Sequence, residues 1–214
     1  LARKAPEQRQ ELIAISGQLT ATQGQLTGLV DMTGVVGAFR ADQKPGDINL
    51  RAACERAVGC FRLVIENYSI SVDMEGVKRS LLVGPLIEGE VYSVLINVLS
   101  NAVKSLIASA RPDKEIRLSA STRGGKVLLI VEDNGLGLDP EFFSEVFSPF
   151  ISDPGGELYD RLQAHANPED APLFGTGSGL GLAIARDILR SRKGDMRFVE
   201  PSDDWSACLE IELP

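Results

Sequence analysis

Apolar and polar residues alternate along the chain in patterns that predict a series of helices and strands. Between Glu7 and Phe39 apolar side chains recur at heptad-like spacing, which is typical of a helix that packs against other helices. This stripe consists of Leu12, Ile15, Leu19, Thr22, Leu26, Leu29, Thr33 and Val36. The glycines that interrupt it each cost a helix about 1 kcal/mol relative to alanine. We therefore expect this helix to need the support of a helical bundle.

The sequence Lys44-Pro45-Gly46 marks a break after this first helix. Proline and glycine together are strong signals for a turn or loop. Asn49 then provides an N-cap for a second amphipathic helix that we expect to run to about Glu66. We place a domain boundary at the break. Residues 1–46 are predicted to be the C-terminal part of a helical region, and residues 47–214 a separate domain.

Beyond residue 66 the pattern predicts short strands interspersed with helices. Strands are expected at Ser69 to Asp73, Ser80 to Val83, Ile116 to Thr122, Val127 to Glu132, Met196 to Val199 and Ala207 to Leu213. Helices are expected at Gly89 to Ser109, Glu157 to Ala166 and Ser178 to Ser191. Because the strands come in neighbouring pairs, the expected fold class is α/β: a two-layer sandwich in which helices cover a mixed sheet. Residues 148–176 are too irregular and too long for an ordinary connection, which is typical of a functional lid or a disordered segment.

Composition and charge narrow the range of partners. Apolar residues make up 43% and charged residues 24% of the chain, as in ordinary globular proteins. The net charge of −8 offers no basic surface for a nucleic acid. The apolar runs are far shorter than the roughly 18 residues that cross a bilayer, and no secretory signal opens the chain. We expect no nucleic acid partner, no membrane contact from this chain and a cytoplasmic location. The chain begins at Leu1 without a methionine, which indicates a fragment of a longer protein that can be anchored in a membrane through another part.

Three polar residues share one face of the helix predicted from Gly89. At about 100° per residue, Asn97, Asn101 and Lys104 fall within an arc of roughly 60°. An amide carbonyl is a hard oxygen ligand for Mg²⁺, and a lysine supplies a positive charge for phosphate. A solvated helix face would produce the same pattern, so this motif alone does not decide between the two interpretations.

An apolar strand ends abruptly in the sequence Asp133-Asn134-Gly135-Leu136-Gly137. Glycines permit close approach of a backbone, and a carboxylate beside an apolar wall can accept a hydrogen bond from an exocyclic amine such as that of adenine. An ordinary Asn-Gly turn is the alternative interpretation. The motif is thus a candidate recognition site for a purine.

Alternating glycines lead into the helix predicted near residue 178: Gly175, Gly177, Gly179 and Gly181. Backbone N–H groups at a helix N-terminus form a site for anions. The spacing is not that of a Walker loop, which ends in Gly-Lys-Ser/Thr, and the loop does not follow a strand directly as a dinucleotide fingerprint would. It nonetheless predicts a phosphate-binding loop.

These motifs, in this order, resemble the catalytic ATP-binding domain of sensor histidine kinases, in the Bergerat-fold superfamily that includes the DNA gyrase B subunit. Asn97 to Lys104 is similar to the N box of the family, and Asp133 to Gly137 to its G1 box. Val146 to Phe150 is similar to the F box, and Gly177 to Leu182 to the G2 box. The resemblance covers about residues 49–214.

The resemblance implies roles for individual residues. Asn101 would ligate Mg²⁺, Asn97 and Lys104 would face the phosphates, and these three would carry catalysis. Asp133 would bind the adenine amine. Phe147 and Phe150 would anchor a lid spanning about residues 148–176. The ATP contacts implied in this way are Asn97, Asn101, Lys104, Asp133, Gly135, Gly137, Phe150, Thr176, Gly177, Ser178, Gly179, Leu180 and Gly181.

The residue at position 97 favours kinase over hydrolase chemistry. Hydrolysing members of the superfamily carry a glutamate general base four residues before the metal-binding asparagine, whereas this chain has Asn97, which cannot accept a proton. The sole histidine, His165, does not resemble a phosphoacceptor. We therefore expect the chain to phosphorylate a histidine upstream of Leu1, with a response regulator receiver domain as the next acceptor. A homodimer would form through the N-terminal helices. A serine kinase of the anti-sigma type and a non-catalytic ATP-sensing or scaffold module are the alternatives.

Overall fold

The computed structural model describes residues 44–168, 170, 179–202 and 204–214. The helix predicted between Glu7 and Phe39 lies outside these residues. So do Thr176, Gly177 and Ser178 of the glycine-rich loop. The division of the chain into two domains at residue 46 stays a prediction, although Gly46 itself already belongs to a strand of the second part.

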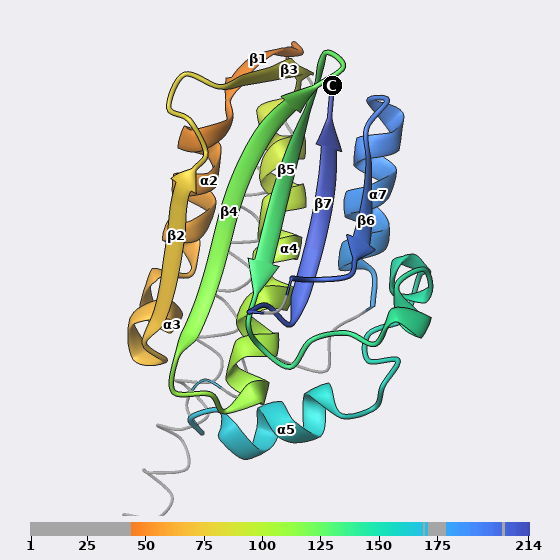
Figure 1. The fold of residues 1–214 in the computed structure, drawn as a ribbon. Coiled ribbons are helices and arrows are strands. Elements are labelled where there is room, and N and C mark those ends of the chain that lie inside the picture. Colours follow the sequence, from red (N-terminus) through yellow and green to blue (C-terminus); the bar gives the residue numbers. More distant parts are fainter. Residues whose placement is uncertain (1–43, 169, 171–178, 203) are drawn as a thin grey trace, which may run out of the picture.

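A five-stranded mixed sheet forms one layer of the molecule, as Figure 1 shows. The strand order is β2-β4-β5-β7-β6. The strands are β2 (Ile70–Gly76), β4 (Lys114–Arg123), β5 (Lys126–Asp133), β7 (Ala207–Leu213) and β6 (Asp195–Val199). Only the pairing of β2 with β4 is parallel; the other neighbouring strands are antiparallel. A separate antiparallel pair consists of β1 (Gly46–Asn49) and β3 (Leu82–Leu86).

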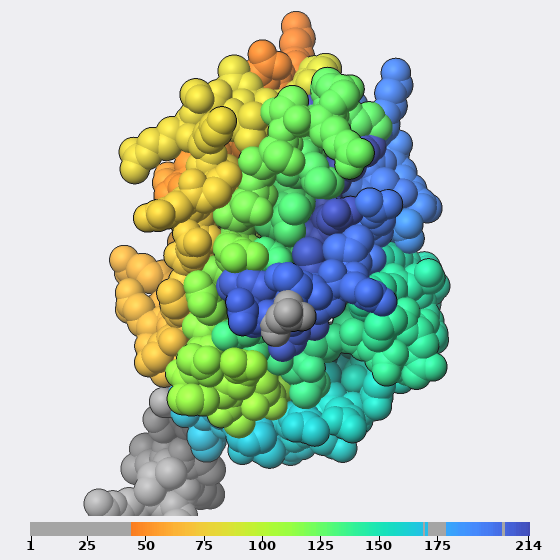
Figure 2. Space-filling model, in the orientation of Figure 1, coloured from red at the N-terminus to blue at the C-terminus, as the bar shows by residue number. Residues whose placement is uncertain are grey.

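Helices form the second layer, against one face of the sheet (Figure 1). They are α2 (Leu50–Cys60), α3 (Arg62–Asn67), α4 (Glu88–Ser109) and α7 (Gly181–Ser191), while α5 (Leu158–His165) lies across one end of the sheet. Two short 3₁₀ helices, Pro140–Phe142 and Glu145–Phe147, precede α5. On the opposite face the strands themselves form the molecular surface, as the space-filling view in Figure 2 shows. The expected two-layer α/β fold class is confirmed.

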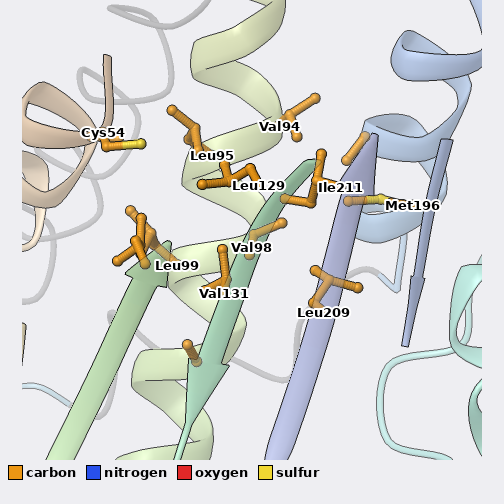
Figure 3. Close-up of a cluster of buried hydrophobic side chains, with 14 of the residues drawn as sticks. Cys54, Val94, Leu95, Val98, Leu99, Leu129, Val131, Met196, Leu209 and Ile211 are labelled. Carbon is orange, nitrogen blue, oxygen red and sulfur yellow. The ribbon is translucent and has the colours of Figure 1, made fainter. Parts of the chain in front are cut away.

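Side chains from α4 and the central strands form the core between the layers. Leu129 of β5 and Ile211 of β7 point toward α4 and are almost fully buried, because alternate residues of a strand face the same side. Figure 3 shows them meeting Val94, Leu95, Val98 and Leu99 of α4. Full burial of each such side chain stabilises the fold by about 1.5–3 kcal/mol. Within the described residues, α4 alone is long and apolar enough to cross a bilayer, but 61% of its most apolar window is buried inside the fold, as expected of a core helix.

Several element boundaries differ from the sequence-based expectations. The helix predicted to run from Asn49 to Glu66 is interrupted at Phe61, two residues after Gly59, a poor helix former. Strand β3 is displaced toward the C-terminus relative to the prediction, and β1 was not predicted. Both strands depend on pairing with each other across more than thirty residues, which local periodicity does not reveal. Asn49 acts as the predicted N-cap, and its side chain accepts a hydrogen bond of 2.9 Å from Ala52 N.

Candidate functional site

A cavity of about 870 Å³ lies between α4, the C-terminal end of β5, residues 138–159 and the start of α7. Its wall includes Asn97, Asn101 and Lys104 from α4, and Asp133 from β5. Gly137, Gly179 and Gly181 also line it. The structure thus brings together residues from all three of the motifs identified in the sequence, which are separated by up to about 80 positions.

Asn97 lies where α4 meets the first turn of α7. Its Nδ2 donates a hydrogen bond of 2.8 Å to the carbonyl of Ser93, one turn earlier in α4. Its Oδ1 lies so close to Gly181 that a Cβ at that position would approach it to 2.4 Å. Because only glycine fits there, the first turn of α7 can reach the polar face of α4.

Lys104 is a partly buried positive charge on the cavity wall. Burial lowers the pKa of its ammonium group. Among the residues that the structure describes, no carboxylate lies within ion-pair distance of Lys104. A desolvated cation without a protein counterion favours binding of an anion from solution.

The amino-terminal end of α7 adds a second feature that favours anions. Leu180 occupies its N-cap position and provides no side-chain hydrogen bond to the first turn. The first N–H groups of a helix have no partners within the helix, and they carry the positive end of the helix dipole. Since Gly181 and Leu182 line the cavity, this end of α7 faces the same space as Lys104. Leu180 itself is not part of the cavity wall.

Asp133 is a buried carboxylate at the end of β5. Its Oδ1 accepts hydrogen bonds of 3.0 Å from Ser105 Oγ and of 3.0 Å from Gly135 N. Burial raises the pKa of the carboxyl to about 6, although both hydrogen bonds act in the opposite direction. Within the described part of the chain, no hydrogen bond engages its Oδ2. Asp133 therefore presents one free acceptor atom to the cavity.

The residues that follow Asp133 hold the strand end in place. Asn134 accepts a hydrogen bond of 2.8 Å from Glu115 N and donates one of 2.7 Å to Asp113 O, which ties the end of β5 to the start of β4. Gly135 packs against the backbone of α4 and does not line the cavity. Its predicted contact with a ligand is therefore replaced by a packing role, because α4 occupies the space beside it.

Phe150 also differs from the expectation. Its side chain is 77% exposed and does not line the cavity, so its ring does not anchor the segment that follows. Its backbone N–H instead donates a hydrogen bond of 2.9 Å to Gly179 O. Phe147 is buried, with its ring centroid 5.8 Å from that of Phe198 and with the Arg186 guanidinium 4.6 Å from its own centroid.

Ser105 and Tyr159 are among the cavity residues that were not identified from the sequence. Ser105 lies one residue beyond Lys104, and an isolated serine in a helix carries no recognisable signal. Tyr159 of α5 is half-buried on the cavity wall, and burial raises the pKa of its phenol. The site has the buried Asp133 carboxylate and apolar side chains, together with an amine, amides and a helix N-terminus; Asp139, Glu141, Asp153 and Glu157 also line the cavity. This arrangement suits a ligand with a flat amine-bearing ring and a polyanionic tail.

Comparison with known proteins identifies the family of this chain. The model of the family described as "Histidine kinase-, DNA gyrase B-, and HSP90-like ATPase" matches residues 87–214, more than half of the chain. The methanogenesis regulatory histidine kinase FilI of Methanothrix harundinacea is 31% identical over 144 residues, which are 65% of this chain and 14% of FilI. The sensor histidine kinase GlrK of Escherichia coli K12 is 29% identical over 168 residues, 78% of this chain and 31% of GlrK.

Solved structures of histidine kinases have the same fold. The catalytic domain of histidine kinase ThkA superposes with a TM-score of 0.59 at 22% identity, over 79% of this chain and 96% of that domain. Full-length ShkA in complex with AMPPNP superposes with a TM-score of 0.57 at 18% identity, over 97% of this chain and 38% of ShkA. The chain therefore spans less than a third of the length of FilI and GlrK, but nearly all of the ThkA catalytic domain.

Proposed function

The chain belongs to the histidine kinase-, DNA gyrase B- and HSP90-like ATPases, and on this premise we propose that its cavity binds Mg-ATP for transfer of the γ-phosphoryl group to a histidine outside the chain. Membership of the family implies ATP binding. The relatives are a regulatory histidine kinase, FilI, and a sensor histidine kinase, GlrK. The chain corresponds to the catalytic ATPase domain of a sensor histidine kinase of two-component signalling.

The single observation that carries the proposal is the shared cavity of Asp133 and Lys104. Asp133 would accept a hydrogen bond from the adenine amino group through Oδ2. Lys104 and the N-terminus of α7 would neutralise the phosphates. That ShkA, which has the same fold, was solved in complex with AMPPNP supports binding of ATP by this domain. Gly137 and Gly179 would contribute backbone to the wall of the same site. Thr176, Gly177 and Ser178, which lie outside the described residues, stay predicted ATP contacts.

The donors around the cavity fit a magnesium ion that is held jointly with the phosphates. Asn101 is exposed on the cavity wall, one turn before Ser105, and an amide oxygen is a suitable hard ligand. Within the described residues there is no group of three or more histidine, cysteine, aspartate or glutamate side chains that could hold a metal alone. Mg²⁺ commonly uses one or two protein ligands together with substrate phosphates and water. Asn101 is therefore the residue that would hold the ion, which would neutralise charge on the phosphates.

Replacing Asn101 by alanine is expected to weaken ATP binding in the presence of Mg²⁺ by on the order of tenfold, as for loss of one contact to a charged group. In EDTA the variant and the parent protein should bind ATP equally. Calorimetric titration in both buffers measures the difference. The exposed Asn67, at the end of α3, provides a matched Asn67→Ala control. An Asn101→Ala protein that keeps its full magnesium dependence would exclude this residue as the ligand.

The side chains near the phosphate end favour phosphoryl transfer over hydrolysis. Asn97 occupies the position of a general base, and its Nδ2 donates a hydrogen bond to the carbonyl of Ser93 while its Oδ1 lies close to Gly181. Without a base to activate water, the nucleophile would come from another domain. The protein would contribute positioning of the triphosphate and neutralisation of its charge. His165 is exposed at the end of α5, where its Nδ1 contacts the carbonyl of Arg161 at 2.7 Å, and does not line the cavity.

We further propose that the phosphorylated histidine passes its phosphoryl group to an aspartate of a response regulator receiver domain. The intact kinase would be a homodimer joined through the helical region that precedes residue 47, with this domain in the cytoplasm. Both statements rest on the relatedness to sensor histidine kinases.

Labelling of the intact protein with γ-³²P-ATP tests the proposed reaction. A label that is lost in acid and kept in base is expected, because phosphohistidine has this stability. Asp133→Ala should abolish the labelling. An acid-stable label would support the serine kinase alternative instead. Nucleotide binding without any label, even when a histidine-bearing hairpin is present, would support an ATP-sensing module.

A further inference from the structure

We propose that Ser105 is a positioning residue that assigns separate tasks to the two oxygens of Asp133, and so sets the preference of the site for a purine with a 6-amino group. This inference rests on the proposed binding of ATP. It assigns to Ser105 of α4 an effect on nucleotide preference that is exerted through Asp133 and not by direct contact with the ligand.

A chain of hydrogen bonds passes through the hydroxyl of Ser105. Leu136 N donates to Ser105 Oγ at 2.9 Å, and Ser105 Oγ donates to Asp133 Oδ1 at 3.0 Å. The direction is determined by chemistry, because a backbone N–H only donates and an ionised carboxylate only accepts. The Ser105 hydroxyl therefore donates its one proton to Asp133 Oδ1, and it accepts the hydrogen bond from Leu136 N through a lone pair.

A second donor holds the same carboxylate oxygen. Gly135 N also donates to Asp133 Oδ1, at 3.0 Å. Gly135 keeps this position because its Cα packs against α4, where a Cβ would come within 2.6 Å of the carbonyl carbon of Ser105. Rotation of the carboxylate would move Oδ1 away from both donors in a buried site, at the cost of two hydrogen bonds to a charged group. Oδ1 is thereby fixed as the structural oxygen.

The remaining oxygen, Oδ2, then has only one hydrogen-bonding role. Oδ2 of the ionised carboxylate accepts hydrogen bonds and cannot donate them. A 6-amino group offers a donor to this atom, a 6-keto group offers another acceptor, and a hydrogen at position 6 offers neither. A site that hydrogen-bonds a ligand group discriminates strongly against analogues that lack it. Discrimination therefore depends on how firmly Ser105 and Gly135 hold Oδ1.

The test compares ATP with purine riboside triphosphate, which keeps the ring and the triphosphate but lacks the 6-amino group. The ratio of their affinities is measured by calorimetry for the parent protein and for Ser105→Ala. We expect the ratio to fall about fivefold in the variant, as for the loss of one hydrogen bond that orders a charged acceptor. Ser109→Ala is the matched control, since Ser109 lies on the same helix with its Oγ bonded to Leu106 O at 2.8 Å, away from Asp133.

Two further proteins exclude a general structural effect. Ser105→Cys keeps a side chain of similar size with a weaker donor, so its ratio should also fall even if Ser105→Ala folds poorly. In an Asp133→Ala background, Ser105→Ala should leave the ratio unchanged, because the residue through which it acts is absent. If Ser105→Ala and Ser105→Cys both still bind ATP and neither changes the ratio of the two affinities, the proposed role of Ser105 is overturned. Absence of nucleotide binding by the parent protein would instead overturn the proposed function.

Discussion

Replacing Asp133 by asparagine is expected to weaken ATP binding by about 100-fold, because the site loses a charged acceptor and gains a donor that faces the adenine amine. Ser105 and Gly135 would still donate to the amide oxygen at the Oδ1 position. The amino group would then point into the cavity. We therefore expect the variant to favour inosine triphosphate, whose 6-keto group accepts hydrogen bonds, relative to ATP. Calorimetry with both nucleotides measures this change, and an unaltered preference would contradict the assigned role of Asp133.

The same substitution is expected to stabilise the nucleotide-free fold at neutral pH. Burial raises the Asp133 pKa from 3.8 to about 6, so the folded protein binds this proton more tightly than the unfolded chain. The stability contribution of the group therefore falls as pH rises between these two values and stays low above pH 6. Asparagine does not ionise. We therefore expect Asp133→Asn to raise the free energy of unfolding at pH 8 by on the order of 2 kcal/mol, after allowance for the burial of its own amide.

Urea unfolding at pH 5 and pH 8 measures this gain. The difference between Asp133→Asn and the parent protein should be larger at pH 8, where the buried carboxylate is ionised. Asp187→Asn is a suitable control, because Asp187 is an exposed residue of α7 outside the cavity. A parent protein that is more stable than Asp133→Asn at pH 8 would show that the carboxylate contributes to folding in a way that its burial does not explain.

Alanine at position 135 is expected to destabilise the fold by at least about 3 kcal/mol, since overpacking against a rigid backbone is among the costliest single changes. The added Cβ would lie 2.6 Å from the carbonyl carbon of Ser105 and 2.7 Å from Leu106 N. These are backbone atoms near the C-terminal end of α4, beside the buried Leu106, and they cannot move without displacing the core. The end of β5 would have to separate from the helix, and Asp133 would lose the donor at residue 135.

Gly59→Ala provides the opposite case in the same protein. Gly59 lies in α2, and a Cβ there would meet no atom within 4 Å. Alanine is the better helix former, so this substitution should stabilise the protein by about 0.5–1 kcal/mol. Urea unfolding of both variants at pH 7 compares them directly. Equal tolerance of alanine at the two positions would contradict the close contact between β5 and α4.

Much of the fold was predictable because its signals are local. Helical periodicity placed Asn97, Asn101 and Lys104 on one face of the helix now seen as α4, and all three line the cavity. Gly124 and Gly125, a pair of residues typical of turns, connect β4 to β5 and adopt positive φ angles of 59° and 79°. Spacing determines these features because a helix or a turn forms from residues that are close in sequence.

The sequence by itself determined the class of the fold, the helix face with its three polar residues, and the carboxylate at the end of a strand. Only the tertiary structure decided that Ser105 holds Asp133, that Gly135 packs on α4 without lining the cavity, and that the ring of Phe150 is exposed. Ser105 and Asp133 are 28 positions apart, and β1 pairs with β3 across more than thirty positions. Periodicity describes the direction of a side chain from its own element. The partner that it meets depends on how closely two elements pack, and that distance is set by the whole core.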